Sequence, residues 1–138
     1  MQKKWKLILK KEVARLAKKY ELKLVMLFGS SSRGSALTDS DIDLAILANE
    51  NFYEKKYSDF SYDLTEVENT LKKNIDIVPI SNYNPLLLYN IFNDGEALYI
   101  RDEDEYASIR SWARFSYEDN QRFFYDRNEN IKKRLRRL

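Results

Sequence analysis

Apolar and polar positions alternate along the chain in a way that predicts helices and strands in turn. Over residues 3–20, apolar side chains recur every three or four positions, as on one face of a helix, and lysines fill the other faces. Two short apolar runs, at residues 23–28 and 41–47, are typical of strands. The segment between them, residues 29–40, is predicted to be a loop, with a short helix beginning near Ser31, because a small hydroxyl residue can cap it.

The alternation continues in the next part of the chain. Residues 49–73 carry apolar side chains at helical spacing, most clearly from Ser58 onward, and the beginning of this segment is left open between helix and loop. Residues 74–80 form a third predicted strand. An Asn-Pro pair, typical of a helix N-cap and first turn, opens a helix over residues 84–93, which an Asp-Gly pair ends. Residues 97–100 form a last, short predicted strand.

Strands that alternate with helices predict an α/β (or α+β) fold, in which helices pack on a sheet. The composition changes after residue 101, since residues 102–138 are compatible with a helix, carry many charges and aromatic side chains, and end in a basic run. A length of 138 residues suits one domain that buries a real core. Residues 1–101 are therefore predicted to form the main body, and residues 102–138 a helical extension of the same domain.

Composition excludes several kinds of site. The chain has no cysteine and no histidine, so disulfides, thiolate zinc sites, thiol nucleophiles and the commonest general base are absent. A general base must then be Asp or Glu, and a metal site must be rich in oxygen, which favours Mg²⁺ over zinc. The net charge of +2 gives no overall electrostatic reason to expect nucleic acid. No apolar run is long enough for a signal peptide or a membrane span, so a cytoplasmic protein is predicted.

The candidate chemistry lies around the loop at residues 29–40. Side chains two positions apart on a strand face the same side, roughly 6–7 Å apart, so Asp41 and Asp43 would face one spot. Two like charges this close repel unless a cation lies between them, and Mg²⁺ is commonly held by one or two carboxylates together with substrate phosphates. Gly29 would let a phosphate approach the backbone amides, the Ser30 hydroxyl could donate to it, and Arg33 could add a charged fork.

These residues resemble a known family. Gly-Ser, followed after ten residues by Asp-x-Asp, resembles the signature of the DNA polymerase β-like nucleotidyltransferase superfamily. The longer string GSSSRGSALTDSDIDLAIL resembles its small bacterial branch, the minimal nucleotidyltransferases of the MntA type, which are antitoxins encoded beside HEPN-domain toxins. The resemblance implies the nucleotidyltransferase fold, with a small mixed sheet, flanking helices and a C-terminal helical extension. It also implies a third carboxylate on a later strand, which Asp76 supplies.

The activity that the resemblance implies is transfer of AMP from ATP to a tyrosine hydroxyl of a HEPN ribonuclease toxin. Asp41, Asp43 and Asp76 would bind Mg²⁺, as two ions, and Asp76 would take the hydroxyl proton. The Gly-Ser turn would hold the departing pyrophosphate. The expected partners are ATP, as substrate, and the toxin, for which the aromatic and charged tail at residues 102–138 is the candidate docking surface. No membrane and no direct nucleic-acid contact are expected.

Each feature also has a plainer interpretation. An Asp-x-Asp pair can cap the start of a strand, Asp76 can face solvent, and Arg33 can be an ordinary surface residue. The Gly-Ser turn at the matching distance favours the metal interpretation. Two other functions stay open: an antibiotic nucleotidyltransferase of the aminoglycoside type, and a non-catalytic antitoxin that acts by binding alone. Asp43→Asn separates the two enzymatic functions from the non-catalytic one. It abolishes AMP transfer if the chain is an enzyme, and it leaves toxin neutralisation unchanged if the chain acts by binding alone.

Overall fold

A single mixed sheet organises the described part of the chain. The computed structural model describes residues 4–29, 41–81 and 84–136, with side chains for all of these except 122–128, 130 and 131. The described strands form a four-stranded sheet in the order β3-β2-β1-β4. They are β1 (Leu24–Phe28), β2 (Ile42–Leu47), β3 (Ile75–Pro79) and β4 (Glu96–Ile100). β1 runs antiparallel to β2 and β4, whereas β2 and β3 are parallel.

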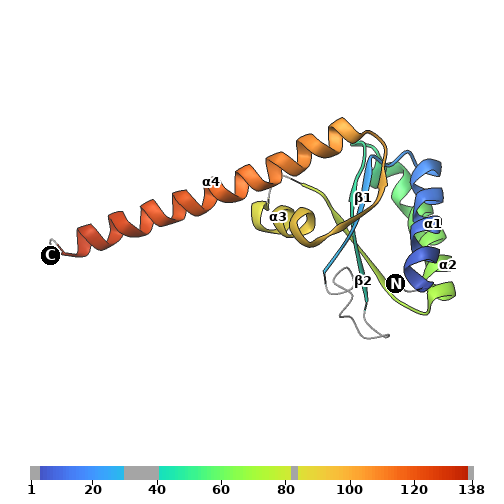
Figure 1. The fold of residues 1–138 in the computed structure, drawn as a ribbon. Coiled ribbons are helices and arrows are strands. Elements are labelled where there is room, and N and C mark those ends of the chain that lie inside the picture. The colour runs from blue at the N-terminus through green and yellow to red at the C-terminus, as the bar shows by residue number, and fades with distance from the viewer. Residues whose placement is uncertain (1–3, 30–40, 82–83, 137–138) are drawn as a thin grey trace.

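Helices cover both faces of this sheet (Figure 1). They are α1 (Lys4–Lys19), α2 (Tyr57–Leu71), α3 (Pro85–Asp94) and α4 (Glu103–Arg136). A short π-helical turn, η1 (Phe52–Lys56), leads into α2. α1 and α2 lie side by side on one face, and α3 and the first part of α4 lie on the other (Figure 1). The sheet is therefore the middle layer of three.

The face under α1 and α2 holds the larger core. Alternate residues of the central strands point into it, and Leu27, Leu44 and Ile46 are at most 1% exposed. The two helices contribute apolar side chains at helical spacing, namely Leu9, Val13, Leu16, Phe60, Leu64 and Val67. Because side chains on this face recur at every second strand position, this core fixes which residues face the opposite side.

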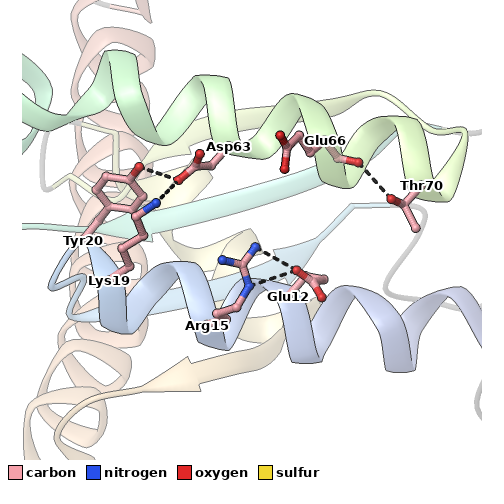
Figure 2. Close-up of polar contacts among 7 residues, drawn as sticks. All are labelled: Glu12, Arg15, Lys19, Tyr20, Asp63, Glu66 and Thr70. Atoms are coloured by element: carbon pink, nitrogen blue, oxygen red, sulfur yellow. Dashed lines mark hydrogen bonds and ion pairs between the residues drawn. The ribbon is translucent and has the colours of Figure 1, made fainter.

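Polar contacts join α1 to α2 at the rim of this core (Figure 2). The Lys19 ammonium and the Tyr20 hydroxyl both donate to the Asp63 carboxylate, at 2.7 and 2.5 Å. The hydrogen bonds from Lys19 and Tyr20 lower the pKa of Asp63 below its usual value. The ring of Tyr20 also packs edge-on against Phe60, with centroids 5.6 Å apart. The rim is thus held by hydrogen bonds and ring packing together.

The face under α3 and α4 holds a smaller core. Its buried residues come from the strands, from α3 and from α4, namely Leu24, Met26, Ala45, Leu88, Ile91, Phe92 and Ala113. α3 begins as predicted, with the Asn84 side chain accepting the Leu87 N–H at 3.1 Å. Beyond the contact at Ala113, the 34-residue α4 extends away from the sheet (Figure 1). Acidic residues in its first turn and basic residues in its last suit the helix dipole.

The predicted fold class is confirmed, and the predicted helices and strands are present, with ends displaced by one or two residues. The open question at residues 49–73 resolves into a turn, then η1 and α2, because Phe52 in η1 is buried against the α2 residues Tyr57 and Phe60. The helix predicted near Ser31 lies outside the described residues. None of the described helices is long and apolar enough to cross a membrane. The cytoplasmic location, and the division at residues 101 and 102, stay predictions.

Candidate active site

Two of the predicted acids lie next to each other on adjacent strands. Asp43, the second residue of β2, is the register partner of Asp76, the second residue of β3. Neighbouring strands are about 4.8 Å apart, and register partners point to the same face. That face is the one under α3, since Asp43 alternates with the buried Ala45 of the smaller core. The core under α1 and α2 thus turns both acids toward the opposite side of the sheet.

Asp41 lies just before β2 and shares this side by alternation. Asp43 is half-buried, while Asp41 and Asp76 are exposed. Burial raises the pKa of Asp43, and the negative charges of Asp76 and Asp41 raise it further. Within the part of the chain that the structure describes, no three acidic side chains already converge tightly enough to hold a metal ion. A cation would have to draw these carboxylates inward, and it would relieve the repulsion that Asp43 now carries.

Gly29 directly follows β1 and lies beside Asp43. Its φ of +79° lies in the left-handed region that favours glycine. A Cβ added at this position would lie 2.6 Å from Oδ2 of Asp43, which is far inside van der Waals contact. The register explains this proximity, since Phe28, the residue before Gly29, pairs with Asp43. The absence of a side chain therefore keeps open the space next to the Asp43 carboxylate, as a phosphate approaching the backbone would require.

The turn from α2 into β3 brings Asp76 to this position. The Ile42 N–H at the start of β2 donates to the Asn74 carbonyl at 2.8 Å, which joins the two parallel strands. The Ile75 N–H donates to the Glu68 carboxylate of α2 at 2.9 Å. Sequence reasoning did not single out Glu68. The available signal was an acid in the last turn of a helix, where a negative charge opposes the helix dipole.

The structure thus places Asp41, Asp43, Asp76 and Gly29 at the end of the sheet where β1 ends and β2 and β3 begin. Ser30 and Arg33, the other two predicted phosphate contacts, lie outside the described residues. The side-chain donors that Asp41, Asp43 and Asp76 offer are carboxylate oxygens, which suit a hard cation such as Mg²⁺. An oxygen-lined, negatively charged edge beside a glycine turn can hold a divalent cation together with a polyphosphate.

The chain is similar in sequence to a known family and to a characterised relative. The pattern of the family "Polymerase beta, Nucleotidyltransferase" matches residues 11–104, which include all four strands. The protein adenylyltransferase MntA of Aphanizomenon flos-aquae is 27% identical over 127 residues. That match covers 84% of this chain and 82% of the relative.

Solved structures share the fold. A chain from the crystal structure of a toxin–antitoxin with AMP-PNP matches with a TM-score of 0.68 at 20% identity, covering 88% of this chain and 97% of that one. A chain from a tri-AMPylated Shewanella oneidensis HEPN toxin in complex with MNT antitoxin matches with a TM-score of 0.65 at 18% identity. The second match covers 92% of this chain and 98% of that one.

Proposed function

Because this chain belongs to the polymerase beta nucleotidyltransferase family, we propose that it is an antitoxin that transfers AMP from ATP to a tyrosine hydroxyl of a HEPN-family toxin. The observation that carries the proposal is the register pairing of Asp43 with Asp76 beside the open position at Gly29. The similarity to the adenylyltransferase MntA supports the reaction. The AMP-PNP and AMPylated-toxin complexes that share the fold support the nucleotide and the partner.

Asp41 and Asp43 are the proposed ligands of the ion that would hold the triphosphate, and together with Asp76 they would also hold a second ion. Bound there, two Mg²⁺ ions would supply the positive charge that offsets the triphosphate and the departing pyrophosphate. The carboxylates must be ionised to serve as ligands. Burial and neighbouring charges raise the pKa of Asp43, so acid conditions would oppose metal binding at this residue.

The reaction proposed for this site is an in-line substitution at the α-phosphorus of ATP. The tyrosine oxygen forms a bond to the α-phosphorus, and the bond from that phosphorus to the oxygen bridging to the β-phosphate breaks. Pyrophosphate leaves, and the hydroxyl proton passes to the Asp76 carboxylate. Gly29 leaves room for the phosphates against the backbone, and Ser30 and Arg33 are the proposed side-chain contacts. The chain contributes position and charge rather than a covalent intermediate.

The proposal is tested by incubating the chain with labelled ATP and Mg²⁺, with and without the HEPN toxin, followed by mass spectrometry of both proteins and a coupled assay for pyrophosphate. We expect AMP on a toxin tyrosine and one pyrophosphate per AMP. Asp43→Asn and Asp76→Asn should each lower the rate at least about a hundredfold, the scale of losing an essential charged group. Asp59→Asn, an equal charge change at an exposed site on α2, is the matched control.

The same experiment separates the other functions. If Asp43→Asn still neutralises the toxin fully, the chain acts by binding alone and the catalytic proposal is wrong. If AMP accumulates on an added aminoglycoside and never on the toxin, the acceptor is a small molecule.

A further inference from the structure

The turn between α2 and β3 is held by one residue of α2. After the helix, Lys72 adopts a left-handed conformation with φ of 56°, and its N–H donates to the Glu68 carbonyl. The Lys73 N–H donates to the same carbonyl at 3.3 Å. The Glu68 carboxylate then accepts the Ile75 N–H at 2.9 Å, at the first residue of β3. Glu68 therefore binds the turn through both its backbone and its side chain.

The side-chain contact acts on the strand residue immediately before Asp76. β3 is an edge strand of the sheet, so alternate N–H groups along it face away from β2. The Glu68 carboxylate accepts one of them. The side chain of Ile75 is buried in the core under α1 and α2, whereas Asp76, one residue later, points to the opposite face. Fixing the backbone at Ile75 therefore also fixes where the Asp76 carboxylate stands relative to Asp43.

Helix stability does not explain an acid at this position. Glu68 lies in the last turn of α2, which contains no basic residue. A negative charge there is unfavourable to the helix dipole. A second contact holds the turn, because Lys73 is a buried residue and its ammonium lies 5.0 Å from the centre of the Trp5 ring of α1. The turn thus has a structural anchor in Lys73, and the carboxylate of Glu68 adds a contact aimed at β3.

We infer that Glu68 is a positioning residue for the active site: its carboxylate sets the start of β3 so that Asp76 stands beside Asp43 and can share a cation with it. This inference rests on the proposed function, in which Asp76 serves as metal ligand and base. It adds a residue whose carboxylate acts through the Ile75 backbone and is not itself proposed as a metal ligand.

The test uses the full chain and compares Glu68→Ala, Glu68→Gln and Glu66→Ala. Glu66 is exposed on the same helix, so its removal is a matched charge change. Three properties are measured: amide hydrogen exchange at Ile75, calorimetric binding of Mg²⁺ with AMP-PNP, and kcat for AMP transfer to the toxin. In Glu68→Ala, Ile75 exchange should rise at least about tenfold, and affinity for Mg²⁺ with AMP-PNP should fall about tenfold, as for lost outer partners of metal ligands.

Glu68→Gln should stay within about threefold of the original chain in all three measurements, because an amide oxygen still accepts the Ile75 N–H. Should Glu68→Ala not fold, Glu68→Met replaces it, since Met and Gln are close in volume and only Gln keeps the acceptor. The inference is overturned if the variant without an acceptor lowers only the melting temperature, with metal affinity and kcat equal to those of Glu66→Ala.

Asp76→Asn distinguishes this failure from failure of the proposed function. If Asp76→Asn abolishes transfer while Glu68→Ala behaves like Glu66→Ala, the function stands and the positioning role is wrong. If Asp76→Asn itself leaves transfer and metal binding unchanged, the proposed role of Asp76 is wrong, and the role inferred for Glu68 is overturned with it.

Discussion

The two faces of the sheet differ in how completely they are covered, and the difference explains where the chemistry lies. Under α1 and α2 the strand residues are almost fully buried, and the helices are joined at their rim through Asp63. Under α3 and α4 the core is smaller, and one end of the central strands carries the half-buried Asp43 beside the exposed Asp76. The face under α1 and α2 (the closed face) fixes the strand register. The face under α3 and α4 (the open face) carries the carboxylates in that register.

Breaking the closed face should have the largest effect. Leu44 of β2 is 1% exposed, so Leu44→Ala should lower the free energy of unfolding by about 2–5 kcal/mol, from lost burial and the cavity that remains. Urea denaturation followed by circular dichroism measures this change. Leu7→Ala, at an exposed position of α1, should stay within about 0.5 kcal/mol of the original chain. Equal effects of the two substitutions would contradict the description of the closed face.

Filling the open face should reduce activity more than stability. In Gly29→Ala the new Cβ would meet Oδ2 of Asp43 at 2.6 Å, at a backbone φ of +79°, so the Asp43 carboxylate must turn away. We expect AMP transfer to fall about a hundredfold, the scale of a misplaced catalytic group. The measurement is kcat at saturating ATP.

Gly95→Ala is the contrasting variant for that experiment. At the end of α3 the added Cβ would lie 2.1 Å from the Ile91 carbonyl oxygen, so this change should lower stability and leave kcat per folded molecule nearly unchanged. The distinction fails if Gly29→Ala and Gly95→Ala lose activity and stability in the same proportion.

Removing backbone strain from the turn between α2 and β3, next to the closed face, should stabilise the chain slightly. Lys72 has a φ of 56°, a conformation that glycine adopts with less strain. Lys72→Gly should raise the free energy of unfolding by up to about 1 kcal/mol, as measured by thermal unfolding. Lys72→Ala should give no such gain, because alanine meets the same steric penalty. A loss of stability with glycine would show that the side chain of Lys72 matters more than its backbone.

The polar rim of the closed face should give the smallest effect, and one that depends on pH. Hydrogen bonds from Lys19 and Tyr20 hold the pKa of Asp63 below its usual value in the folded chain. A lowered pKa stabilises the fold at pH values above the pKa that Asp63 has in the unfolded chain. This contribution disappears as the pH falls through the pKa that Asp63 has in the folded chain. Asp63→Asn should therefore lower the melting temperature at pH 7, and this difference should shrink as the solution becomes more acidic. A difference that persists unchanged at acid pH would rule out the ionised carboxylate as its cause.

The closed and open faces also differ in how much of each could be predicted from the sequence. Helix and strand periodicity revealed the fold, because a covered face leaves a regular apolar pattern. Alternation alone placed Asp41 and Asp43 on one side of their strand. The neighbour relation of Asp43 and Asp76 needed the order and register of two separate strands, which no local pattern encodes; the family resemblance anticipated it. Whether these acids act as the metal ligands stays a prediction.

Other features left little trace in the sequence. Glu68 was missed because its partner is a backbone N–H, and any residue except proline at position 75 would present one. The π-helical turn at Phe52–Lys56 was missed because the spacing of its aromatic residues also fits an α-helix or a loop. How far α4 extends beyond the sheet depends on where its contacts with α3 end, which helical spacing within α4 does not encode.

That extension changes how the molecule moves in water. A helix of 34 residues is about 51 Å long at 1.5 Å per residue, which exceeds the diameter of a compact body of 138 residues, about 37 Å. The chain should therefore diffuse as an elongated particle, with more drag than a sphere of 16.5 kDa and with slower rotation about axes perpendicular to the helix. Its nuclear spin relaxation should accordingly depend on bond direction, so that N–H vectors along α4 relax differently from those lying across it.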